Sequence, residues 1–180
     1  MESSPSHHAN LPKWLGDLGT SYLHHFICTQ NFQDIEQAIS HHQRPVKSTP
    51  FGHPDLPGFL NNLGNSYLCS FGYTRNLQDF AHALSYQQKA VESTPSGHAN
   101  LPSYFNNLGD SYLEHFTHTK NSQDVDYAIS HYQNAVESTP SGHPALAVYF
   151  SHLRLSYQVH FQSTHSLSDI QASMLHYFIS

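Results

Sequence analysis

Histidine gives this chain its most obvious chemical potential, because 17 of the 180 residues are histidines. His115 and His118 stand three positions apart, so on a helix both rings would lie on one face and could bind one metal ion. The sequence offers no obvious third ligand for such a site and no glutamate at the spacing of a zinc protease. We therefore interpret the histidines as structural or solvent-exposed, and we expect no metal and no other cofactor. A histidine-rich metal-binding protein is the less favoured alternative.

Thiol chemistry is the second possibility that the residue types raise. A catalytic cysteine needs a neighbouring base or cation that stabilises its thiolate. Cys28 and Cys69 are the only cysteines, and the sequence dictates no such partner for either. No glycine-rich loop that could cradle a phosphate is present. The sequence therefore predicts that this chain is not an enzyme.

Composition excludes several kinds of partner. The formal net charge is −6 at pH 7 with only seven lysines and arginines, which argues against a nucleic-acid partner. No apolar run approaches the ~18 residues of a membrane span, and the first residues do not resemble a signal peptide. The two cysteines form no repeated disulfide pattern, which suits a reducing compartment. We expect a cytoplasmic protein that binds no membrane.

The chain repeats itself with a period of 45 residues, as the spacing of Leu11, Leu56, Leu101 and Leu146 shows. The two central copies are identical at 26 of their 45 positions. A fixed period of this size is typical of solenoids, in which each repeat packs on its neighbours. The predicted organisation is a tail of a preceding repeat at 1–10, repeat 1 at 11–55, repeat 2 at 56–100, repeat 3 at 101–145 and a partial repeat 4 at 146–180.

Each repeat contains two stretches with helical periodicity. In repeat 3 the first stretch, helix A, places apolar residues on one stripe at Phe105, Leu108, Tyr112 and Phe116. The second stretch, helix B, does so at Val125, Ala128, Ile129, Tyr132, Ala135 and Val136. Asn121 is the expected N-cap of helix B, with Asp124 three residues later in a variant of the capping box. Each helix is expected to span about 16 residues, or roughly 24 Å.

Small residues recur on the two facing stripes. A glycine inside a helix costs about 1 kcal/mol relative to alanine, so its recurrence indicates a structural reason. We expect each glycine of helix A to allow close contact with an alanine of helix B, in the pairs Gly19/Ala38, Gly64/Ala83 and Gly109/Ala128.

The repeat resembles the tetratricopeptide repeat. Repeat 3 supplies the residues of that motif at Phe105, Leu108, Gly109, Tyr112, Ala128, Tyr132, Ala135 and Pro140. The family's usual period is about 34, and the additional residues lengthen the helices and the loop between repeats. Long repeats of this kind look like those of kinesin light chains. The amino-acid sequence of the motif is also similar to that of fungal repeat arrays that accompany CHAT peptidase or nucleotide-binding signalling domains. The resemblance implies an all-α, right-handed α-solenoid of antiparallel helix pairs.

The resemblance also implies a function. In this family helix A lines a concave groove that binds a peptide or helix, so we expect a scaffold-type module for protein–protein interaction. The groove residues carried over to this chain are Lys13, Asn61, Asn65, Asn106, Asp110 and Glu114. The alternative is a non-catalytic regulatory or sensor segment of a larger signalling protein of the CHAT or NTPase type.

Two departures from the repeat generate further expectations. Pro45 falls inside helix B of repeat 1, where it should kink that helix or end it early. Residues 2–12 match residues 92–102, which suggests that the chain is a piece of a longer array. Exposed terminal repeats could then self-stack.

Overall fold

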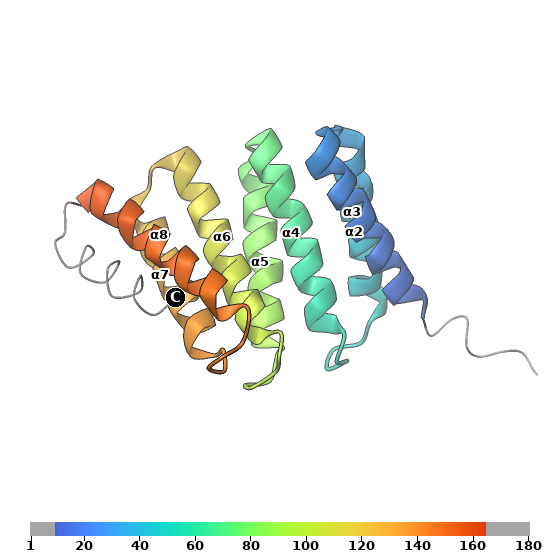
Figure 1. The fold of residues 1–180 in the computed structure, drawn as a ribbon. Coiled ribbons are helices and arrows are strands. Elements are labelled where there is room, and N and C mark those ends of the chain that lie inside the picture. Colours follow the sequence, from blue (N-terminus) through green and yellow to red (C-terminus); the bar gives the residue numbers. More distant parts are fainter. Residues whose placement is uncertain (1–9, 165–180) are drawn as a thin grey trace, which may run out of the picture. The chain divides into compact units, whose positions relative to one another are not determined.

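All regular elements in the described part of the chain, residues 10–164, are α-helices. The computed structural model divides into two compact units that we describe separately. The first unit contains α2 (Leu11–Thr29), α3 (Phe32–Ser48), α4 (Leu56–Thr74) and α5 (Leu77–Glu92). The second contains α6 (Leu101–Thr119), α7 (Ser122–Glu137) and α8 (Leu146–Thr164). Consecutive helices pack as pairs, α2 with α3, α4 with α5 and α6 with α7 (Figure 1). None of the described helices is long and apolar enough to cross a membrane.

The A helices α2, α4, α6 and α8 begin and end at equivalent positions of the repeat. Each has 19 residues, which is longer than the sequence predicts. In α2, α4 and α6 a proline stands in the first turn, where its missing N–H leaves no helical bond unmade. The same three helices end at a residue with left-handed backbone, namely Gln30, Arg75 or Lys120. That residue turns the chain at once into helix B, so little of the repeat remains as loop.

A repeated polar junction joins helix A to helix B. Asn121 is the N-cap of α7, as predicted, and its side chain accepts the Gln123 N–H. The predicted capping box differs in detail, because the Asp124 carboxylate does not bind the Asn121 N–H. That N–H goes to Thr119 Oγ1 at 3.3 Å, and Thr119 Oγ1 lies 3.3 Å from Asp124 Oδ2. His115 Nδ1 completes the junction 2.8 Å from the same carboxylate oxygen. The other two junctions have the same design, with His25 or Ser70 in the place of His115.

The recurring loop histidine has a structural role. In the loop before α4 the His53 N–H bonds the Pro50 carbonyl, which makes a turn with Gly52 in its third position. Gly52 has φ 85°, a conformation that favours glycine. His53 Nδ1 then accepts the Asp55 N–H at 3.2 Å, at the start of the next helix. The same contact recurs at His98 and His143. Asn100 is the N-cap of α6, but its side chain makes no cap bond.

The glycines of helix A allow close helix contact, although their main partners are not the alanines predicted to face them. A Cβ atom on Gly64 would lie 2.6 Å from Gln87 Cγ and 3.1 Å from the Ala83 carbonyl oxygen. On Gly109 it would lie 2.5 Å from the Tyr132 ring, and on Gly19 it would lie 2.6 Å from the His42 ring. The residue four positions after each alanine therefore fills the space above the glycine. The alanines Ala38, Ala83 and Ala128 are fully buried beside it.

Pro45 does not end helix B of repeat 1 early, so that part of the prediction is wrong. The helix α3 runs from Phe32 to Ser48 and contains Pro45 in its last turn. The Pro45 side chain is buried and its carbonyl still accepts the Thr49 N–H at 3.0 Å. A proline so close to the end removes a single helical bond, which packing can offset.

Substitution of Gly64 by alanine tests the close contact. We expect Gly64→Ala to lower the free energy of unfolding by up to about 2 kcal/mol, because overpacking typically costs ~1–3 kcal/mol and the gain in helix propensity is only ~1 kcal/mol. Gly16→Ala is the matched control, since its Cβ would lie at an ordinary 3.5 Å from the Phe59 ring. Urea denaturation measures both variants. Equal stability of the two would contradict this account of the helix pair.

Candidate functional site

A polar pair links helix A to helix B at the same place in every complete repeat. The helix A member lies one position after the packing glycine, and the helix B member is the residue that covers that glycine. The pairs are Thr20 with His42 (3.3 Å), Asn65 with Gln87 (2.9 Å) and Asp110 with Tyr132 (2.7 Å). Because burying an unbonded polar group is costly, each pair satisfies a group that the close helix contact buries.

His42 is almost fully buried, at 1% exposed. Its Nε2 lies 3.1 Å from the Gly16 carbonyl oxygen, which can only accept, so this nitrogen carries the proton. Its Nδ1 then accepts from the Ser66 hydroxyl of α4 at 2.8 Å. Burial lowers the pKa of His42 to about 4, although the bond to Gly16 opposes that shift. His42 is therefore a neutral core residue that ties three helices together.

The predicted groove residues of α4 are largely used inside the fold. Asn65 is half-buried and its Oδ1 accepts from Gln87 Nε2 at 2.9 Å. Asn61 is only 6% exposed. These two amides therefore offer a partner less hydrogen-bonding capacity than the sequence pattern suggests.

Asn106 and Asp110 of α6 lie in one polar network with α7 and α8. Asp110 accepts from Asn106 Nδ2 at 3.0 Å and from the Tyr132 hydroxyl at 2.7 Å. His152 Nδ1 donates to Asn106 Oδ1 at 2.7 Å and lies 3.6 Å from Asp110. Burial raises the pKa of Asp110, and the bond from Tyr132 opposes this effect. Burial likewise raises the pKa of Tyr132. The network is best explained as a junction between helices, since its members bond one another.

Lys13 and Glu114, the two remaining predicted groove residues, have more access to solvent. Lys13 is exposed in the first turn of α2, beside a small hollow of about 130 Å³ that Asp55 and Phe59 also line. Glu114 is half-buried and its Oε1 lies 2.8 Å from His118 Nε2. These two residues are therefore the predicted groove residues that the fold uses least.

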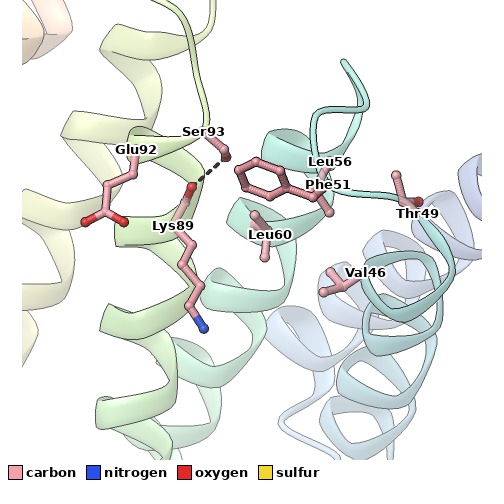
Figure 2. Close-up of a pocket in the computed structure, with 8 residues that line it drawn as sticks. All are labelled: Val46, Thr49, Phe51, Leu56, Leu60, Lys89, Glu92 and Ser93. Carbon is pink, nitrogen blue, oxygen red and sulfur yellow. Dashed lines mark hydrogen bonds between the residues drawn. The ribbon is translucent and has the colours of Figure 1, made fainter.

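A larger hollow lies among the ends of α3, α4 and α5 in the first unit. It has a volume of about 470 Å³, within the range of ligand-binding pockets. Leu56 and Leu60 form an apolar floor, and Phe51 from the α3–α4 loop lies over it (Figure 2). Lys89 and Glu92 of α5 place one charge of each sign at its edge. Sequence reasoning missed this pocket, although the break in the repeat at Phe51 was a visible signal.

Phe51 is the unusual residue of this pocket. Its side chain is 92% exposed, and the equivalent positions of the next two repeats hold Ser96 and Ser141. A phenylalanine left in water at a turn contributes little to the stability of the fold. It is therefore available for contact with another molecule.

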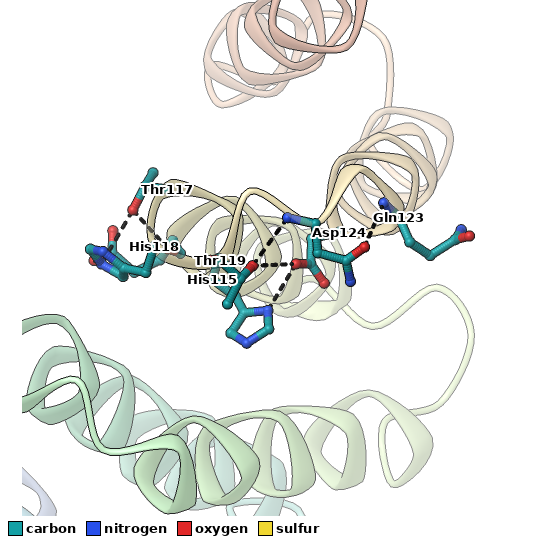
Figure 3. A network of polar contacts seen from close by, with 8 residues as sticks. His115, Thr117, His118, Thr119, Gln123 and Asp124 are labelled. Carbon is teal, nitrogen blue, oxygen red and sulfur yellow. Dashed lines mark hydrogen bonds and ion pairs between the residues drawn. The ribbon is translucent and has the colours of Figure 1, made fainter. Parts of the chain in front are cut away.

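The histidines proposed as metal ligands are each paired with a different carboxylate. His115 bonds Asp124, and His118 bonds Glu114 on the exposed side of α6 (Figure 3). Within residues 10–164, no three histidine, cysteine or acidic side chains are grouped closely enough to hold a metal ion. Cys28 is exposed and Cys69 is half-buried, and the two form no disulfide.

Comparison with known proteins supports the class of fold and nothing finer. No family model matches the chain, and no curated protein matches it significantly in sequence. It is similar to a solved structure, that of BtubC (BKLC) from P. vanneervenii, with a TM-score of 0.64 and 19% identity over 94% of this chain. The chain spans 64% of the length of that protein. The similarity supports an all-α helical-repeat fold and extends no further.

The low pKa of His42 predicts how stability depends on pH. In the unfolded chain the histidine pKa is near 6.5, so between about pH 6.5 and pH 4 the unfolded state binds a proton that the folded state does not. The contribution of His42 to the free energy of unfolding is therefore fully present above pH 6.5, and up to about 3 kcal/mol of it is lost as the pH falls to 4. His42→Gln, which installs the residue that repeat 2 carries at this position, should remove that part of the decrease. Urea denaturation of both proteins across this range provides the measurement, and parallel pH profiles would contradict the assignment.

Proposed function

We propose that this chain is a protein-binding module of the tetratricopeptide kind, with the right-handed solenoid stacking which that class implies. It binds an extended or helical segment of a partner protein and holds an apolar side chain of that segment in the pocket among α3, α4 and α5. The observation that carries the proposal is Phe51, a large apolar side chain that is almost fully exposed above an apolar floor.

The shape and lining of the pocket favour a protein segment as the ligand. Exposed aromatic residues beside a pocket are typical anchors of protein interfaces. Leu60, only 6% exposed, is rigidly held and offers a preformed apolar surface. Lys89 and Glu92 at the edge suit a partner segment that carries charges of both signs around an apolar residue.

The helix A surface supports the proposal less strongly. Asn65, Asn106 and Asp110 are bonded within their own units, which reduces what they can offer to a partner. Lys13 and Glu114 could add polar contacts at the margin of an interface. We therefore place the main contact at the pocket and treat helix A as a secondary surface.

The test is a selection from a library of displayed random peptides against the whole chain. We expect enriched peptides to share a large apolar residue flanked by charges, and their dissociation constants to rise at least about tenfold for Phe51→Ser. Because serine is the native residue at this position in repeats 2 and 3, the variant should keep its fold.

Phe32→Ser is the matched control. Phe32 is also a partly exposed phenylalanine of the first unit, it lies outside the pocket, and repeat 3 carries serine there. Binding should be unchanged in this variant. Enriched peptides that bind the Phe51→Ser protein as tightly as the unmodified chain would refute the assignment of the pocket.

A further inference from the structure

The first helix of the described residues, α2, exposes an apolar stripe that the equivalent helix α4 buries. Leu11 and Leu18 are 43% and 42% exposed, whereas their counterparts in α4, Leu56 and Leu63, are 7% and 0% exposed. Trp14 lies between them on the same stripe and is 51% exposed. Because α4 carries leucines at the same spacing, the difference in exposed fraction comes from what packs on each helix.

The fold itself shows how this chain covers such a stripe. On α4 the cover comes from the preceding repeat, α2 and α3. Ile39 and Val46 of α3 pack against the cluster that contains Leu63, and Gln43 Nε2 donates to the Tyr67 hydroxyl at 2.7 Å. Phe59, which stands at the position of Trp14, lies against the backbone of α2 at Gly16.

The second unit uses the same arrangement. There α7 covers α8, with Ile129 and Val136 packed around Leu153. Gln133 Nε2 donates to the Tyr157 hydroxyl at 2.7 Å, as Gln43 does to Tyr67. Leu153 is only 1% exposed as a result. The complement of the α2 stripe is therefore the trailing side of a repeat of this chain, which recurs in both units.

The last described helix, α8, presents a matching apolar surface. Val148 and Leu155 are 50% and 49% exposed, one turn on either side of Ser151. Ser151 stands at the repeat position of Gly16, which is the place that Phe59 contacts on α2. In the earlier repeats the positions of Val148 and Leu155 hold the hydrophilic or small residues Lys13, Gly58, Ser103, Thr20, Asn65 and Asp110. The apolar change in the last repeat thus surrounds the position where an aromatic residue of a following A helix would lie.

We propose that α8 of one copy of this chain receives α2 of a second copy, head to tail. Trp14 of the second copy lies over Ser151 between Val148 and Leu155, as Phe59 lies over Gly16 within the first unit. Because the two contacting surfaces differ, the interface is heterologous, and association continues from copy to copy unless the geometry closes a ring.

Sedimentation equilibrium over a concentration series tests this proposal, together with the emission of Trp14, the only tryptophan of the chain. We expect the average mass to rise with concentration and the emission to shift to the blue in parallel. Leu18→Glu should weaken self-association at least about 30-fold. Val148→Ser combined with Leu155→Asn should do the same, and it is the safer variant for folding because repeats 3 and 2 carry these residues.

Mixing the two variants distinguishes this interface from any other. The Leu18→Glu protein retains an intact α8 surface, and the double variant retains an intact α2 surface. We expect each to be monomeric alone and the mixture to form a one-to-one dimer that grows no further. The Phe51→Ser protein should associate normally, which separates this proposal from the proposed pocket.

Three results would overturn the proposal. The first is a monomer at all concentrations with unshifted Trp14 emission. The second is self-association that neither variant weakens. The third is a monomer whose Trp14 emission shifts only when a synthetic peptide of residues 31–48, the α3 sequence, is added. That result would assign the α2 stripe to a helix of another protein.

Discussion

The structure depends on the close contact between the two helices of each repeat at one glycine. At Gly19, Gly64 and Gly109 a single added carbon would lie 2.5–2.6 Å from a side-chain atom of helix B. The side chain above each glycine is consequently sealed from water, and His42, Gln87 and Tyr132 are 0–1% exposed. Because these side chains are polar, the contact that gives the pair its stability also requires an internal hydrogen-bond partner.

Each repeat meets this requirement with different residues at the same two positions. In repeat 1 a histidine forms hydrogen bonds with a threonine and a backbone carbonyl. In repeat 2 a glutamine forms a hydrogen bond with an asparagine, and in repeat 3 a tyrosine forms one with an aspartate. The helix A member comes from the surface that the family resemblance assigns to the binding groove. Asn65 and Asp110 therefore use hydrogen-bonding groups inside the fold that the sequence alone assigns to a partner.

The sequence predicts the helix pairs well because their signals are local and periodic. The prolines at the starts of the A helices, the Asn121 cap and the stripe through Leu108 all depend on residues within a few turns. The site is harder to predict because the pairs Thr20/His42, Asn65/Gln87 and Asp110/Tyr132 link residues 22 positions apart whose types change from repeat to repeat. The sequence also leaves the effect of Pro45 open between a kink and an early end of helix B, because that effect depends on how close Pro45 lies to the last turn, and α3 does not end early.

Departures from the repeat carry more functional information than the repeat itself. The shared residues are fully explained by packing, capping and turns, as the loop histidines and the junction aspartates show. Phe51, Val148 and Leu155 are explained by none of these, because each replaces a small or polar residue and each leaves about half or more of its side chain in water. Exposed apolar surface gains free energy only when another molecule covers it. The fold already has a way to add such cover, since within each unit a helix B packs on the helix A that follows it, α3 on α4 and α7 on α8. The apolar change at α8, the last described helix, therefore falls where the fold already makes a helix contact within a unit, whereas Phe51 lies in a loop outside the packed helices.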